Sequence, residues 1–412
     1  LCKIIIFWKI SYICIYMMYQ IGDGIISPLG MTTEENYQAV RAGLTGIQQF
    51  PAGFRGLSDS VLAALISPKE LENFAVPYCG ARTHMMSRYQ QAISAVLESA
   101  VSNTMPDIYR DEIFTSRRVA LIFCTTKGDV DLLCELGNRT TAPRLYPWHA
   151  PQCMMEELEL SGKPYVVMNS TLSGLQAQML ADRLLCKGSP YDFAVIVGVE
   201  LINMFTIFLL KEADLVSDTF VRPYDKAGTG TNPGESASCA IYVSEERFNK
   251  DRKSLHMPSV IKFRSGVVTT DPCSRKNPNP EGFALQRAIK KVMAEENIRN
   301  LSFINVQSIG LKSYHNMISV AIERSGLKKV PVNCFEANFG HSSGSSSLMN
   351  SILGSKSLER KEILPTLGYT DHGVEGKILI NTQLKSSLKH SFISLSSGFG
   401  GVNAVALFTK EK

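Results

Sequence analysis

Polar and apolar positions form their clearest pattern in residues 163–200. An apolar run at 165–168 predicts a short strand, and the polar segment 169–174 that follows it is typical of a turn. Helical spacing then relates the apolar residues Leu175, Met179, Leu180 and Leu184. The sequence Lys-Gly-Ser-Pro at 187–190 predicts the end of this helix, and 193–199 predicts a second strand. The segment therefore indicates a strand, a turn, a helix and a strand.

The same alternation of strand and helix patterns continues through the chain. Residues 82–101 predict an amphipathic helix, and 119–126 predict a strand. In the second half, 283–296 predict a helix, whereas 302–306 and 330–334 predict strands. Strands that alternate with helices favour the α/β class, with parallel sheets covered by helices.

Short sequence signals predict where a helix begins and where the two halves of the chain meet. Thr32 with Glu35 three residues later predicts a helix N-cap, and a helical stretch follows residue 200. The charged run at 245–253 predicts the boundary between an N-terminal half, residues 17–250, and a C-terminal half, residues 251–412.

The first sixteen residues differ from the rest. Residues 1–16 are apolar and aromatic but are interrupted by Lys3, Lys9 and Ser11, so the run is shorter than the ~20 apolar residues that a membrane span needs. The segment also lacks the small-residue cleavage site of a secretory signal. Because Met17 and Met18 resemble a natural start, we expect residues 1–16 to be a non-native or disordered extension, and we expect no membrane span.

Composition narrows the class of protein. The chain has 412 residues and is 44% hydrophobic, enough for a large core, and its net charge of +5 is small for this length. No cluster of Lys and Arg is interleaved with aromatics, which argues against a nucleic-acid partner. The ten Cys contain no C-x-x-C pair, so we expect reduced thiols of a cytoplasmic protein, with no metal site and no cofactor.

The turn at 169–174 is where a family resemblance begins. A strand that delivers a small polar residue to a helix N-terminus is a common way to mount a nucleophile, because backbone N–H groups and the helix dipole there stabilise an anion. This turn, with the helix and strand after it, resembles the nucleophile turn of the β-ketoacyl-ACP synthases, the condensing enzymes of fatty-acid and polyketide synthesis. Aligned on Ser173 and Gly174, the nucleophilic Cys of that family falls on Thr171.

Further motifs resemble the same family, in the same order. They are the segments Gly-Ile-Ile-Ser-Pro-Leu-Gly at 24–30, Arg-Pro-Tyr-Asp at 222–225, Gly-Glu-Ser-Ala at 234–237, Pro-Glu-Gly at 280–282, Gly-His-Ser-Ser-Gly at 340–344 and Gly-Phe-Gly-Gly-Val-Asn at 398–403. The resemblance covers nearly everything from residue 18 onward. It implies the thiolase-type fold, in which two similar βαβ-rich halves pack as α/β/α/β/α layers.

The resemblance also assigns the family's catalytic positions, most of which differ here. The family uses a Cys, two His and a Lys. The second His corresponds to His341, whereas Gln307 replaces the first His, Glu336 replaces the Lys and Thr171 replaces the Cys. A lone His is more often structural than catalytic, although the Gly-flanked turn of His341 supports a functional role equally well. Amide and hydroxyl groups cannot replace the imidazole and the thiolate.

Loss of these groups with retention of the framework favours a subunit without its own turnover. Chain-length factors, which are nucleophile-less relatives that pair with an active ketosynthase, have this character. The resemblance implies such a heterodimer, or a homodimer, together with an acyl carrier protein (ACP). It also implies substrate contacts for Ser173, Phe399, Gly400 and Asn403. Phe399 matches the family's gating aromatic, and a core aromatic at a Gly-rich turn is an equal alternative.

Two other functions stay open from the sequence. His341 and Gln307 could stabilise an enolate, with Thr171 or Ser170 as a hydroxyl nucleophile, giving a stand-alone acyltransferase or a malonyl-ACP decarboxylase. A scaffold that only docks carrier protein is the third alternative.

Overall fold

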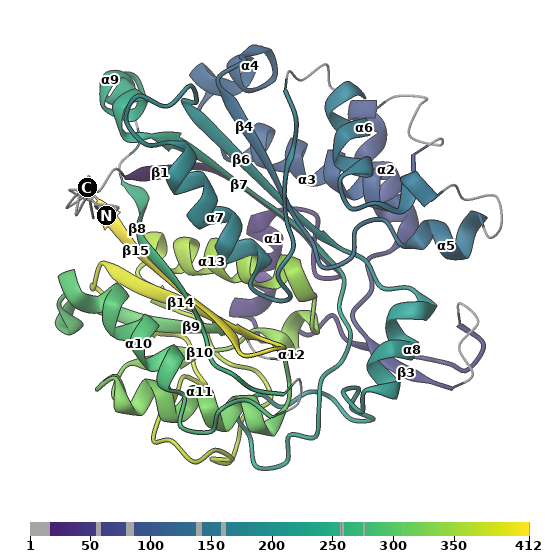
Figure 1. The fold of residues 1–412 in the computed structure, drawn as a ribbon, viewed down its shortest axis with the longest axis vertical. Coiled ribbons are helices and arrows are strands. Elements are labelled where there is room, and N and C mark those ends of the chain that lie inside the picture. Colours follow the sequence, from purple (N-terminus) through teal and green to yellow (C-terminus); the bar gives the residue numbers. More distant parts are fainter. Residues whose placement is uncertain are drawn as a thin grey trace, which may run out of the picture.

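A computed structural model describes most of the chain (Figure 1). The described residues are 17–54, 59–79, 86–136, 142–157, 162–255, 257, 259–274, 277–307 and 309–411. The expected extension, residues 1–16, lies outside them.

Strands of both halves join in one sheet. The strands are β1 (Met18–Ile26), β2 (Gln48–Phe50), β3 (Val61–Ala63), β4 (Val119–Cys124), β5 (Tyr165–Val167), β6 (Phe193–Glu200), β7 (Ser236–Ser244), β8 (Val260–Thr270), β9 (Leu301–Gln307), β10 (Pro331–Asn333), β11 (Glu362–Ile363), β12 (Leu379–Ile380), β13 (Lys385–Ser386), β14 (Ser391–Gly398) and β15 (Val402–Glu411). Within the described chain, eleven of them form a sheet in the order β12-β10-β9-β14-β15-β8-β1-β7-β6-β4-β5.

Helices separate and cover these strands. They are α1 (Thr33–Arg41), α2 (Pro68–Cys79), α3 (Arg88–Asn103), α4 (Asp107–Thr115), α5 (Asp131–Leu136), α6 (His149–Glu157), α7 (Ser173–Leu184), α8 (Met204–Glu212), α9 (Glu245–Leu255), α10 (Phe283–Val292), α11 (Lys312–Arg324), α12 (Glu336–Phe339) and α13 (Ser343–Arg360), with 3-10 turns η4 (Ala142–Leu145), η5 (Met293–Glu295) and η6 (Ile298–Asn300).

The strand order repeats about the middle of the sheet. Outward from β1 the order is β7, β6, β4 and β5, and outward from β8 it is β15, β14, β9 and β10. Each series has two antiparallel pairings followed by two parallel ones. The two series meet where β1 pairs with β8, with Met18 opposite Phe263. The division at residue 250 stays a prediction.

Helices α7 and α13 form the central layer between the two series (Figure 1). α7 contacts β4 to β6 as well as β8 and β15, and α13 contacts strands of both series. The helices approach closely at Gly174, where an added Cβ would lie 2.5 Å from the backbone nitrogen of Leu348. With α3 outside β1, β7 and β6, and α10 outside β8 and β15, the layers are α/β/α/β/α.

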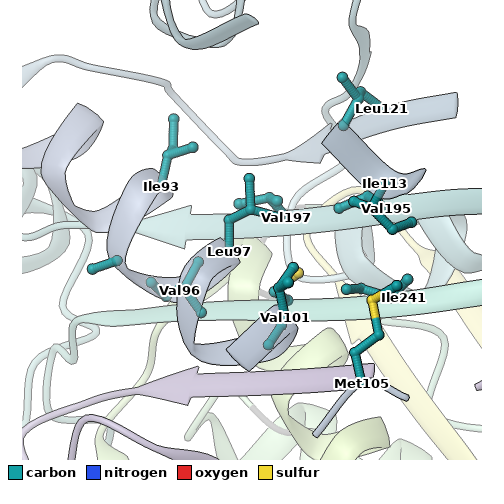
Figure 2. Packing of buried hydrophobic residues seen from close by; sticks show 14 of the residues in the cluster. Ile93, Val96, Leu97, Val101, Met105, Ile113, Leu121, Val195, Val197 and Ile241 are labelled. Carbon is teal, nitrogen blue, oxygen red and sulfur yellow. The ribbon is translucent and has the colours of Figure 1, made fainter. Parts of the chain in front are cut away.

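The outer core of the first half lies under α3. Figure 2 shows Val96, Leu97 and Val101 of this helix over Val197 and Ile241 of the sheet, and all five side chains are buried. Helical spacing on one side and strand alternation on the other place these apolar groups face to face, and their burial stabilises the layer contact.

Some element ends differ from the sequence-based expectation. The capping box of Thr32 and Glu35 is confirmed. Helix α3 begins at Arg88, later than expected, because Ser87 and Gln90 form a second capping box. β5 ends at Val167, and α10 ends at Val292 and continues as η5. The charged run at 245–253 is part of α9.

The described residues were also compared with the requirements of a membrane span. None of their helices is both long enough and apolar enough to cross a bilayer.

Asp182 on α7 gives a pH-dependent test of the central layer. Burial raises the pKa of this half-buried carboxyl to about 7, with Arg183 opposing the rise. A carboxyl whose pKa is raised in the folded state costs stability as pH rises from its ordinary pKa, about 4, towards 7. We expect Asp182→Asn to raise the free energy of unfolding at pH 8 by on the order of 2 to 4 kcal/mol, and by little at pH 4.

Urea unfolding at the two pH values measures this difference. Asp192→Asn serves as the control of opposite sign, because hydrogen bonds from Arg118 lower the pKa of Asp192. That variant should lose stability at pH 8. A pH-independent effect of Asp182→Asn would contradict the prediction.

Candidate functional site

The turn between β5 and α7 holds Thr171. Ser170, just before it, has a φ of 50°, a left-handed conformation that non-glycine residues rarely adopt. Ser173 secures the turn, because its Oγ accepts the Asn169 N–H at 2.9 Å and donates to the Ser170 carbonyl at 2.8 Å. The buried hydroxyl of Ser173 is thus engaged by the turn itself, and its expected substrate contact stays a prediction.

Thr171 directs its hydroxyl into the protein. The residue is 1% exposed, and its Oγ1 donates to the Ser397 carbonyl at 3.2 Å. Ser396 Oγ lies 3.2 Å from the same oxygen. These described partners are a carbonyl and a second hydroxyl, and neither accepts a proton at neutral pH. The contacts therefore provide no general base for Thr171.

Gln307, at the end of β9, continues the network. Ser396 Oγ donates to Gln307 Oε1 at 2.7 Å, and Gln307 Nε2 donates to Glu336 Oε1 at 3.3 Å. The same nitrogen lies 3.4 Å from His341 Nδ1. Gln307 therefore separates the Thr171 side of the network from its ionisable groups.

His341 and Glu336 form the far side of the network. Glu336 opens α12, and Gly340 at its end has a φ of 67° that leads the chain to His341. His341 Nδ1 lies 3.5 Å from Glu336 Oε1, and both residues are buried. The family's Lys position thus places a carboxyl, rather than a cation, beside the retained imidazole.

The structure therefore brings together the four positions assigned from the sequence. They come from the turn before α7, the end of β9, α12 and the turn before α13. Ser396 of β14, which links Thr171 to Gln307, was not expected. A polar pair, Ser396 and Ser397, at the end of a buried strand was the available signal.

Phe399, Gly400 and Asn403, the other residues for which substrate contacts were expected, lie next to the Thr171 turn. Half-buried Phe399 contacts Tyr314 edge-to-face, with ring centroids 6.1 Å apart, and Gly400 is exposed. Asn403 is buried, accepts from Ser397 Oγ at 2.7 Å and donates to the Gly401 carbonyl at 3.0 Å. Asn403 therefore supports the strand that carries Ser396, and the substrate contacts of these residues stay predictions.

A buried aromatic pair behind Glu336 was also not expected. The rings of Tyr224 and His315 stack with centroids 4.4 Å apart. Burial lowers the pKa of His315 to about 3, so its imidazole is neutral at pH 7. Burial, together with nearby Cys334 and Glu336, holds the pKa of Tyr224 well above its ordinary value. Neither ring therefore adds a charge at neutral pH.

Asp225 ties together two loops that border the site. Its carboxylate accepts hydrogen bonds from the N–H groups of Thr370 at 2.6 Å, Asp371 at 2.8 Å and Ala227 at 2.9 Å, and from Arg222 Nε at 3.1 Å. Burial alone would raise the pKa of Asp225, but these donors hold it well below its usual range.

The loop that Asp225 fixes also holds the backbone of His341. The Asn232 carbonyl accepts the N–H of His341 at 2.7 Å, and the Gly234 N–H donates to the His341 carbonyl at 3.1 Å. Asp225 therefore supports the position of His341 from a distance.

Metal-ligating side chains do not gather in the described part of the chain. No group of three or more His, Cys, Asp or Glu side chains that could hold a metal ion occurs among the described residues. The described cysteines at 124, 153, 186, 239, 273 and 334 are free thiols.

Comparison with known proteins agrees with this architecture. No family model matches the chain. The chain is 23% identical to the chloroplastic 3-oxoacyl-ACP synthase II of Arabidopsis thaliana over 95% of this chain and 75% of the relative. It is 21% identical to 3-oxoacyl-ACP synthase 2 of Vibrio harveyi over 94% of this chain and 97% of the relative.

A solved structure shows the same fold. The complex of a ketosynthase with its chain length factor from Xenorhabdus doucetiae contains a chain that superposes with a TM-score of 0.76 at 17% identity, covering 96% of this chain and 98% of that one. The fold is thus thiolase-type. Over most of its length the chain is similar in sequence to 3-oxoacyl-ACP synthases, which are also called β-ketoacyl-ACP synthases.

Removing the Asp225 carboxylate should destabilise the protein in a pH-dependent way. A carboxyl with a lowered pKa stabilises the fold above its ordinary pKa and loses this effect as pH falls through the folded value. We expect Asp225→Asn to cost about 2 to 4 kcal/mol at pH 7, and less at pH 3. Urea unfolding at both pH values measures the cost. Thr370→Ser, which keeps the backbone N–H, is the control. Equal losses of stability for the two variants would argue against the role of the Asp225 carboxylate in tying the two loops together.

Proposed function

We propose that this chain is a chain-length-factor-like subunit that pairs with an active β-ketoacyl-ACP synthase in acyl-chain elongation. The observation that carries the proposal is the surroundings of Thr171. Its hydroxyl contacts Ser396 and Ser397, and in the described part of the chain the hydrogen bonds from it lead to the imidazole of His341 through Ser396 and Gln307. A threonine needs an adjacent base to act as a nucleophile, and an amide does not accept a proton at neutral pH.

The position of Glu336 weakens the decarboxylase alternative. Loss of CO₂ from a malonyl group leaves an enolate, which needs neutral or positive donors. Glu336 Oε1 lies 3.5 Å from His341 Nδ1 and 3.3 Å from Gln307 Nε2, so a carboxyl oxygen lies beside both potential donors. If this carboxyl is ionised, its negative charge opposes a second one nearby.

The edge strand β5 of the first half supports the proposal of a partner subunit. β5 is the last strand of its series, and β4 is its neighbour in the described sheet. Tyr165, Val166 and Val167 are half-buried and Met168 is 46% exposed. An apolar edge strand is an aggregation hazard unless another chain covers it.

A ketosynthase is the partner that would complete such a subunit. In the Xenorhabdus doucetiae complex a ketosynthase is bound to its chain length factor. A homodimer of this chain would contain two Thr171 sites and no family thiol. We therefore infer a heterodimer whose second subunit carries the nucleophile, and an acyl carrier protein that delivers its substrates.

The first test concerns covalent chemistry. Purified protein given malonyl-ACP and acyl-ACP should release no CO₂ and form no acyl adduct, and cerulenin, which alkylates the family's Cys, should leave the Thr171 peptide unmodified. Peptide mass spectrometry and a CO₂ assay measure these outcomes, with an intact β-ketoacyl-ACP synthase as the positive control. An adduct on Thr171 or steady CO₂ release would favour the acyltransferase or decarboxylase.

The second test concerns the edge strand. Val167→Lys places a charge on half-buried β5 and should abolish co-purification with the ketosynthase of the same pathway. Leu388→Lys is the control, because Leu388 is 85% exposed and lies just before β14, which is far from β5 in the sheet order. A stable monomer, together with a ketosynthase that is fully active without this chain, would refute the subunit proposal.

A further inference from the structure

Helix α8 (Met204–Glu212) is firmly anchored on its inner side. Asn203 caps it, and its Oδ1 accepts the Thr206 N–H at 2.8 Å. Ile207 is buried against Val61 of β3 and Ile202. Figure 1 shows α8 beside β3. The helix is thus held by a cap and by an apolar contact.

The outer side of α8 is apolar. At 100° per residue, the positions opposite Thr206 and Ile207 form one arc. Its large side chains are Met204, Phe205, Phe208 and Leu209, which are 42%, 45%, 56% and 49% exposed. An outer helix face of a water-soluble domain is normally polar, so a contiguous apolar arc marks a contact surface.

The exposed charged residues at the end of this arc, and just after it along the chain, are acidic. Glu212 lies on the exposed arc itself, and Asp214 and Asp218 follow it on the exposed chain. Lys211, the cation of the helix, pairs with Asp59 at 3.4 Å. The apolar arc therefore carries a negative border.

We propose that this surface, formed by Met204, Phe205, Phe208, Leu209 and Glu212, binds a short, net-basic amphipathic helix of another protein. Apolar side chains of that helix would cover the two phenylalanines, and its Lys or Arg side chains would face Glu212. The two helices would recognise each other through apolar side chains that lie four residues apart, at positions i and i+4.

The charge also decides against a second copy of this chain as the occupant. Two copies would bring like-charged borders together, which opposes association. An arc on nine residues is also smaller than the ~800 Å² per partner of a standard stable interface, so a reversible complex with a short element fits better.

A designed peptide tests the proposal directly. The probe is a synthetic helix of Leu and Lys with Leu at i, i+3, i+4 and i+7, and its counterpart with Glu in place of Lys is the charge control. Fluorescence anisotropy with the full chain should show micromolar binding of the Leu/Lys peptide and at least tenfold weaker binding of the Leu/Glu peptide. Phe208→Ser should weaken the Leu/Lys complex at least tenfold.

Charge reversal and a matched surface variant complete the design. Glu212→Lys should weaken the Leu/Lys peptide and strengthen the Leu/Glu peptide, whereas Leu388→Ser, at an 85% exposed leucine elsewhere, should change neither. Circular dichroism shows whether each variant is folded. Equal binding of both peptides, or binding unaffected by Phe208→Ser and Glu212→Lys, overturns the proposal. Dimerisation of the free chain that Phe208→Ser abolishes overturns it in favour of a second copy.

Discussion

The close contact of α7 with α13 is the constraint on which the rest of the structure depends. The Cβ position of Gly174 lies 2.5 Å from the backbone of Leu348, so a larger residue would force the helices apart. Hydroxyl groups make this close packing possible: Ser347 accepts the Leu175 N–H, and Ser351 accepts from Gln178. Because Thr171 precedes α7 and His341 precedes α13, this contact also sets the distance between the two sides of the site.

The candidate site joins hydroxyl, amide, carboxyl and imidazole groups in one polar network. Gln307 donates to Glu336 and accepts from Ser396, so its amide fills the space between them with satisfied hydrogen bonds. A buried carboxyl beside an imidazole needs such support, and Glu336 obtains it from Gln307. Thr171, Ser396, Gln307, Glu336 and His341 therefore form one connected polar network.

The sequence predicted the framework better than the network. The α/β alternation predicted the class of fold, and the resemblance of the motifs to those of the β-ketoacyl-ACP synthases implied that Thr171, Gln307, Glu336 and His341 share one site. Ser396 was missed, because the polar pair of Ser396 and Ser397 at the end of a buried strand does not by itself indicate a site. The apolar arc of α8 was equally inaccessible, because Phe205 and Phe208 in a run of apolar residues resemble a buried helix. Its exposure depends on which face β3 covers.

The single proton of a hydroxyl group gives the network a direction. Thr171 donates to a carbonyl and Ser396 donates to Gln307 Oε1, so the amide group of Gln307 must turn its NH₂ towards His341. The path of hydrogen bonds between Thr171 and His341 therefore passes through an amide, which does not relay protons at neutral pH.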